Sequence, residues 1–130
     1  MTLAFSLLSI CLILTPAAIE MIRVLKEINL KNKLKGLSPL DISIGIHTGD
    51  AVVGNIGSEK RMEYTVVGDT VNTASRIEAQ SAQKNNMILI SETTYQHIKD
   101  YFEVSEWDDL YLKGKTKKIK LFEVIREKNF

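Results

Sequence analysis

A short strand that runs directly into a helix with a fixed polar pattern constrains this chain more than any other feature. Residues 62–67 predict the strand, and the Gly-Asp pair at 68–69 predicts a break before a helix over about residues 70–82. Asn72 and Arg76 are four residues apart, so both lie on one face of that helix, close to its N-terminus.

This pair has the chemistry to bind a phosphate and a sugar. Free N–H groups and the dipole at a helix start favour anions, and an Arg guanidinium and an Asn amide add directed hydrogen bonds. The same residues are equally consistent with an ordinary helix that is capped by Asp69 or Thr70 and carries a solvated Arg76 without a ligand. The helix alone leaves both interpretations open.

The remaining periodicity predicts a mixed α+β domain. Apolar residues at helical spacing indicate an amphipathic helix over about residues 17–34, which Gly36 ends. Alternating or continuous apolar runs indicate strands, and Ser91 is a suitable cap for a second short helix. The expected later elements are strands at 42–47, 51–56, 64–67 and 87–90, a helix at 92–99, and a final antiparallel pair at 102–107 and 118–125.

The N-terminus is uncharged from Thr2 to Ile19. A signal peptide would need a basic start, and a membrane span would need about 20 apolar residues without the break at Thr15-Pro16. Three explanations stay open: a truncated or frame-shifted reading frame, a short anchor or signal, and a replacement buried element. We treat residues 1–16 as a segment of unassigned status and 17–130 as the domain, and we expect a cytoplasmic chain with membrane association through residues 2–19 left open.

Composition argues against several classes of protein. The chain has 130 residues and a formal net charge of +1, which gives no reason to expect nucleic-acid binding. The single cysteine, Cys11, excludes an internal disulfide. His47 and His97 have no neighbours at metal-ligand spacing, so we expect both to be structural.

The order of four segments resembles the catalytic domain of class III nucleotide cyclases, the adenylate and guanylate cyclases, and their bacterial branch most. These segments are residues 44–50, 53–58, 62–76 and 112–115. The resemblance covers residues 17–125 and only the C-terminal portion of the family's domain. It implies an α+β fold, an N-terminally truncated α/β sandwich with a ferredoxin-like core and helices on a mostly antiparallel sheet.

The resemblance also implies an activity, the conversion of ATP to cyclic AMP and pyrophosphate with Mg²⁺ or Mn²⁺. The family holds its two metal ions with two Asp residues upstream of the segments above. Residues 1–40 of this chain contain no Asp, and their only acids are Glu20 and Glu27, both in the expected helix. We therefore predict no metal ligands in this chain.

Five residues match functional positions of the family. Asn72 matches the ribose-positioning amide, and Arg76 the guanidinium that stabilises charge on the triphosphate. Thr65 and the backbone of Val66 match positions that read the base, and a Thr there resembles adenylate cyclases. Lys113 matches a lysine that contacts the terminal phosphates, although residues 113–120 are Lys-rich and equally typical of a solvated surface.

Class III domains pair head to tail and share each active site across the interface. The resemblance therefore implies that this chain supplies the ribose, triphosphate and base side of a site, in a homodimer or with an intact cyclase protomer. Without metal ligands, the chain alone is expected to be inactive. The alternative is a non-catalytic, degenerate cyclase module that binds an intact cyclase.

Overall fold

The computed structural model describes residues 7–49, 52–56, 63–67, 69–84, 86–111 and 118–129, with the side chains of α1 described from residue 13 and the β2–β3 hairpin described by its backbone. Its elements are α1 (Leu7–Leu34), β1 (Ser43–Ile46), β2 (Val52–Ile56), β3 (Glu63–Val67), α2 (Asp69–Ser81), β4 (Met87–Ser91), α3 (Glu92–Ile98), β5 (Phe102–Tyr111) and β6 (Lys118–Glu127).

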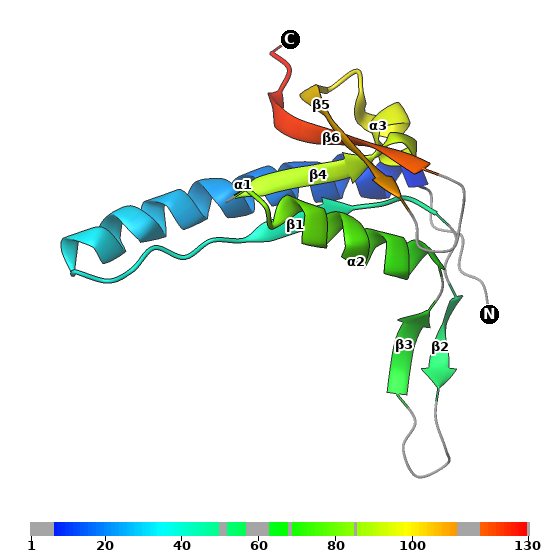
Figure 1. The fold of residues 1–130 in the computed structure, drawn as a ribbon, viewed down its shortest axis with the longest axis horizontal. Coiled ribbons are helices and arrows are strands. Elements are labelled where there is room, and N and C mark those ends of the chain that lie inside the picture. Colours follow the sequence, from blue (N-terminus) through cyan, green and yellow to red (C-terminus); the bar gives the residue numbers. More distant parts are fainter. Residues whose placement is uncertain are drawn as a thin grey trace.

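Four strands form one sheet in the order β1-β4-β6-β5 (Figure 1). β1 runs parallel to β4, whereas β4–β6 and β5–β6 are antiparallel. β2 and β3 pair with each other in a separate hairpin that extends away from the sheet (Figure 1). The predicted α+β fold with a mostly antiparallel sheet and a final antiparallel pair is confirmed.

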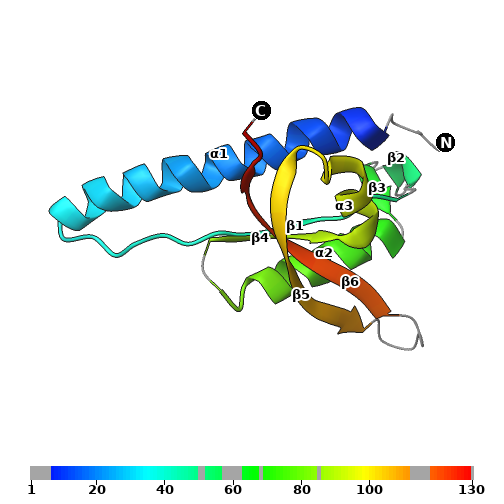
Figure 2. The same cartoon turned by 90° about the horizontal axis from the view of Figure 1, so that it is seen from above.

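The two faces of the sheet are covered by different helices (Figure 2). On one face, Ala18 of α1 and Ile98 of α3 pack with Ile88 and Ile90 of β4 in a cluster that also contains Phe122. On the other face, Ile77 of α2 packs with the remaining apolar side chains, Met87, Leu89, Leu110 and Leu121. β4 is buried along its whole length, which explains why its sequence is continuously apolar rather than alternating.

Helix α1 begins ten residues earlier than the periodicity predicts, at Leu7 instead of about residue 17, and passes through Pro16. Proline removes one backbone hydrogen bond and disfavours a helix interior. Packing just beyond the proline compensates, because Ala18 is buried in the core on one face of the sheet. The domain boundary drawn between residues 16 and 17 stays a prediction.

The other end of α1 follows the sequence closely. Gly36 has a φ of 75°, its N–H donates to the Lys33 carbonyl, and the N–H of Leu37 donates to the Asn32 carbonyl at 2.8 Å. This is the Schellman arrangement, which favours glycine at the left-handed position. The Asn29 side chain then holds the returning chain through two 2.8 Å hydrogen bonds to the backbone of Leu40.

The sequence left open a membrane association through residues 2–19, and the structure corrects this part of the expectation. From Leu7 onward, the described part of the chain has no helix long and apolar enough to cross a bilayer. The physical reason lies in α1 itself, because Glu20, Arg23, Lys26 and Glu27 interrupt the apolar run after Ile19.

Candidate active site

Helix α2 carries the two polar residues that the sequence singled out, and both are exposed on one face of it. Asn72 and Arg76 lie one turn apart and are exposed, whereas Thr73 and Ile77, each about 100° further round the helix, are buried. Ile77 is completely inaccessible to solvent. The apolar face therefore fixes the rotation of α2 about its axis, and this rotation sets the direction of the polar pair.

Two glycines allow α2 to lie directly on β1 and on the chain that follows it. A Cβ at Gly45 would lie 2.4 Å from the backbone nitrogen of Glu78, closer than two atoms can approach. A Cβ at Gly49 would lie 2.6 Å from Oγ1 of Thr70, in the first turn of α2. The backbone of α2 at Ala74 and Glu78 thus contacts β1, and the Thr70 side chain in its first turn contacts the chain just after β1. These contacts leave little freedom for the helix, and with it Asn72 and Arg76, to shift.

Thr65 and Val66 lie in β3, opposite Gly54 and Val53 of β2. β3 ends at Val67 and α2 begins at Asp69. Thr65 and Val66 therefore lie a few residues before the start of the helix that carries Asn72. Their backbone positions are described, and their assignment to the base remains a prediction. Lys113 lies outside the described residues, between the end of β5 and the start of β6.

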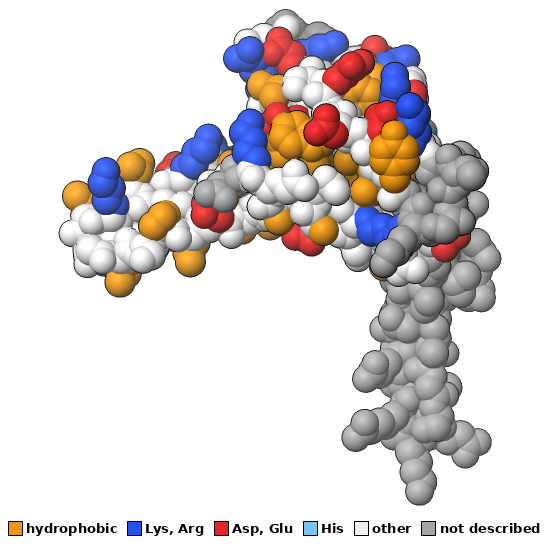
Figure 3. All heavy atoms as spheres, viewed as in Figure 1, with side chains coloured by type: hydrophobic (Ala, Val, Ile, Leu, Met, Phe, Trp, Pro, Cys, Tyr) orange, Lys and Arg blue, Asp and Glu red, His pale blue; other side chains and the backbone are white. Residues whose placement is uncertain are grey.

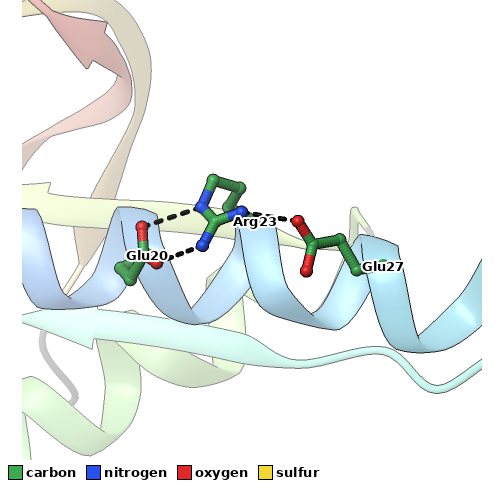
Figure 4. Close-up of polar contacts among 3 residues, drawn as sticks. All are labelled: Glu20, Arg23 and Glu27. Atoms are coloured by element: carbon green, nitrogen blue, oxygen red, sulfur yellow. Dashed lines mark hydrogen bonds and ion pairs between the residues drawn. The ribbon is translucent and has the colours of Figure 1, made fainter.

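The two acids of the N-terminal region are engaged with Arg23 (Figure 4). Arg23 Nε donates to Glu20 Oε2 at 2.9 Å, Nη1 donates to Glu27 Oε1 at 2.6 Å, and Nη2 also pairs with Glu20. The hydrogen bond from Arg23 lowers the pKa of Glu20, and the same bond raises the pKa of Arg23. All three side chains are exposed on α1.

The family's divalent metal ions do not fit this part of the molecule. A hard cation needs several converging oxygen ligands, and Glu20 and Glu27 are separated by the guanidinium between them. In the described ranges, from residue 7 to residue 129 with their gaps, no three His, Cys, Asp or Glu side chains converge in a way that could hold a metal ion. The prediction that this chain has no metal ligands stays a prediction.

Sequence reasoning missed a polar cluster at the carboxyl ends of β1 and β4. His47 Nδ1 lies 2.7 Å from Ser91 Oγ, and Thr48 Oγ1 lies 2.9 Å from Thr94 Oγ1. Burial lowers the pKa of His47. Ser91 precedes α3 as predicted but makes no side-chain cap hydrogen bond, because its hydroxyl is directed to His47 and Thr93. Only the adjacency of parallel strand ends could have indicated this cluster.

Comparison with known proteins identifies the family. The model of the adenylate and guanylate cyclase catalytic domain matches residues 9–125. Adenylate cyclase 1 of Rhizobium meliloti is 34% identical over 101 residues, which are 78% of this chain and 15% of that protein.

Two solved structures agree in fold. The adenylyl cyclase CyaB from P. aeruginosa is 35% identical with a TM-score of 0.76, over 85% of this chain and 56% of that one. A non-canonical dimeric guanylyl cyclase domain from the aquatic fungus Blastocladiella emersonii is 33% identical with a TM-score of 0.58, over 72% of this chain and 48% of that one. This chain therefore spans about half the length of the solved domains and a smaller share of the curated relative. The match to the family model over residues 9–125 shows that it belongs to the adenylate and guanylate cyclase catalytic domain family.

Proposed function

We propose that this chain supplies one side of a nucleotide cyclase active site that is shared with a second cyclase domain. The observation that carries the proposal is the presentation of Asn72 and Arg76 together, exposed and one turn apart on a helix whose neighbouring face is buried. Membership of the cyclase family supports the roles that we assign to these two residues. The non-canonical dimer of the guanylyl cyclase domain from Blastocladiella emersonii supports the pairing of cyclase domains as such, and the sharing of the site is part of this proposal.

The proposed reaction closes a ring within a nucleoside triphosphate. The ribose 3′ oxygen attacks the α-phosphorus, the bond from that phosphorus to the bridging oxygen of pyrophosphate breaks, and the 3′ hydroxyl proton is released. Asn72 holds the ribose so that the 3′ oxygen is in line with the leaving group. The Arg76 guanidinium donates hydrogen bonds to triphosphate oxygens as charge builds up on them.

The preferred substrate in this proposal is ATP. We assign Thr65 to the purine edge by its match to the family's base-reading position, and a hydroxyl can accept from the adenine amino group. Val66 contributes its backbone, and Lys113 contacts the terminal phosphates. The family includes both adenylate and guanylate cyclases, so the choice of ATP rests on Thr65. Thr65→Glu should weaken discrimination for ATP over GTP, and unchanged selectivity would remove Thr65 from the base site.

The divalent ion, Mg²⁺ or Mn²⁺ in the family, supplies charge neutralisation on the triphosphate when bound. The acids of this chain's N-terminal region are already paired with Arg23 and do not match such a site. We therefore assign the carboxylate ligands to the second domain and expect the isolated chain to be inactive. The competing function is a non-catalytic module that binds an intact cyclase, and the same Arg23 pairing favours it.

A complementation assay separates the two functions. The chain is incubated with ATP and Mn²⁺, alone and with the P. aeruginosa adenylyl cyclase domain in which the residue matching Arg76 is replaced by Ala. Cyclic AMP in the mixture, and not with either protein alone, is the expected result. The variant R76A should give no product in the mixture, while R126A, which removes an exposed arginine on β6, should give the normal amount.

The absence of product in the mixture would contradict the catalytic proposal if circular dichroism shows that the chain is folded. Detectable binding of the two domains under those conditions would then favour the non-catalytic module.

A further inference from the structure

The hydroxyl side chains at the start of α3 make contacts that reach beyond their own helix. Thr94 is completely inaccessible to solvent, and its Oγ1 lies 2.9 Å from Oγ1 of Thr48, which is also buried. Thr93 Oγ1 donates to the Thr48 carbonyl at 3.3 Å, and Ser91 Oγ lies 3.3 Å from Thr94 Oγ1. We call these four residues, Thr48, Ser91, Thr93 and Thr94, the hydroxyl cluster.

The hydroxyl cluster ties the chain that leaves β1 to α3. Thr48 is held at its side chain and at its carbonyl by two consecutive residues of α3, and the preceding His47 is held by Ser91 at 2.7 Å. α3 itself is fixed on the sheet by Ile98, which is completely buried in the core with β4. Residues 47–49 therefore have a defined place relative to α3.

The same short segment contacts α2 on its other side. Gly49 follows Thr48, and a Cβ at Gly49 would lie 2.6 Å from Oγ1 of Thr70. Thr70 belongs to the first turn of α2, two residues before Asn72. α3 and α2 cover opposite faces of the sheet (Figure 2). Residues 47–49 therefore connect the first turns of two helices that lie on different faces.

The two contacts of α2 with β1 and its continuation hold different parts of the helix. The backbone of residues 74–78 lies against β1 at Gly45, and Arg76 is within this stretch. The first turn of α2 lies against residues 47–49, and Asn72 is between the two contacts. A shift of residues 47–49 should therefore move Asn72 more than Arg76.

We propose that the hydroxyl cluster orients Asn72 for ring closure, with Thr94 as the positioning residue at its centre. Because Thr94 is completely buried, it acts through Thr48 and the chain after it, and not by contact with the nucleotide. This inference rests on the proposed function, in which Asn72 holds the ribose in line with the leaving group. An error in that alignment lowers turnover more than substrate binding, because in-line geometry is required in the transition state.

The first test measures kinetics in the complementation mixture. Thr94→Val keeps the shape of the side chain and removes its hydrogen bond to Thr48, so it should lower turnover about tenfold and change KM for ATP less than about twofold. Thr94→Ser restores a hydroxyl and should recover about half of the turnover or more. The matched control is Ser81→Ala, which removes another completely buried hydroxyl, bonded to the Glu78 carbonyl at 2.7 Å, and should leave turnover unchanged.

The second test uses the full chain alone, without nucleotide or a second domain. In Thr94→Val, hydrogen exchange at the amide of Thr73, near the start of α2, should accelerate about fivefold relative to the amide of Ser81 at its end. Thr94→Ser should exchange like the parent chain. Circular dichroism and urea unfolding establish that each variant is folded before it is compared.

A second variant removes the same hydrogen bond from its other partner. Thr48→Val should reproduce both effects of Thr94→Val, and the double variant should add little to either, because the two residues act through one contact. Additive losses in the double variant would overturn the inference. An equal loss of turnover in Ser81→Ala would also overturn it, since the effect would then follow from lost stability and not from position.

These results are separate from the outcome of the cyclase assay itself. Cyclic AMP from the parent chain with unaltered turnover in Thr94→Val would leave the proposed function standing and remove the positioning role. No cyclic AMP from the parent chain, with faster exchange at Thr73 in Thr94→Val, would do the reverse: the link from α3 to α2 would stand and the proposed function would fall.

Discussion

The two long helices of this molecule differ in how completely their surfaces are used. In α2, with 13 residues, Thr73, Ile77 and Ser81 are buried and the outer face carries Asn72 and Arg76. In α1, with 28 residues, large apolar side chains remain exposed as far as Leu34, which is 90% accessible.

The exposed face of α2 is polar and carries candidate site residues, whereas α1 exposes an apolar face that is not covered by another element of the described structure. Figure 3 shows such apolar side chains along the arm that α1 forms with the returning chain. A helix with one buried apolar face holds its polar face in a defined direction, which suits the orientation of a reacting substrate. An exposed apolar row contributes nothing to the stability of the isolated chain and gains free energy only when it is covered. The predictions below test whether α2 and α1 differ in this way.

The largest effect is expected on the exposed face of α2. In the complemented cyclase, Arg76→Ala or Asn72→Ala should lower turnover by about 10²–10⁴-fold with a smaller change in KM, because these contacts strengthen in the transition state. Steady-state kinetics with ATP measure both parameters. Glu78→Ala, an exposed change on the same helix, should be nearly neutral. Equal losses in KM and turnover would assign the pair to ground-state binding instead.

The buried face of α2 should contribute more to the free energy of unfolding than the exposed apolar face of α1 does. Ile77→Ala removes a fully buried side chain and should lower the free energy of unfolding by about 2–5 kcal/mol. Ile28→Ala, at 42% exposure on α1, should cost less than about 1 kcal/mol. Urea unfolding of the two variants gives the comparison. Similar losses would mean that α1 is covered in solution, for example by a second copy.

The close approach of α2 to β1 predicts a third effect. Gly45→Ala places a Cβ against the backbone of Glu78 and the carbonyl of Ala74, neither of which can rotate away. We expect a loss of about 1–3 kcal/mol and a displaced α2. Gly36→Ala is the matched control at the end of α1. No atom lies within 4 Å of the added Cβ there, so only the positive φ opposes it, at about 1 kcal/mol.

Much of the fold follows from local patterns, and the failures have physical causes. β4 and α2 were predicted because a continuous apolar run and a helical period are properties of neighbouring residues. The early start of α1 was not predicted, because the burial of Ala18 in the core compensates for the helix-breaking tendency of Pro16. The hydroxyl of Ser91 turned from its expected cap to His47, which is 44 residues away in sequence.

The candidate site shows the same division. The shared face of Asn72 and Arg76 is a consequence of helical spacing and could be predicted. The contact of Gly45 with α2, which fixes where that face lies, joins residues about 30 positions apart and leaves no local signal. The pairing of Glu20 and Glu27 with Arg23 follows the i, i+3 and i, i+4 rule, so the spacing of these residues was enough to predict it.

The smallest effect is expected at His47, which lies outside both helices, so its contribution to stability is independent of the comparison between α1 and α2. Because burial lowers its pKa in the folded chain, the unfolded chain binds the proton more tightly, so the stability that neutral His47 contributes is present above about pH 6.5 and is lost as the pH falls below that value. Urea unfolding between pH 8 and pH 5 should show this decline, and His47→Asn, which can keep a hydrogen bond to Ser91, should reduce it. Glu20, whose pKa is also lowered, titrates below this window. An unchanged pH dependence in His47→Asn would assign the decline to other groups.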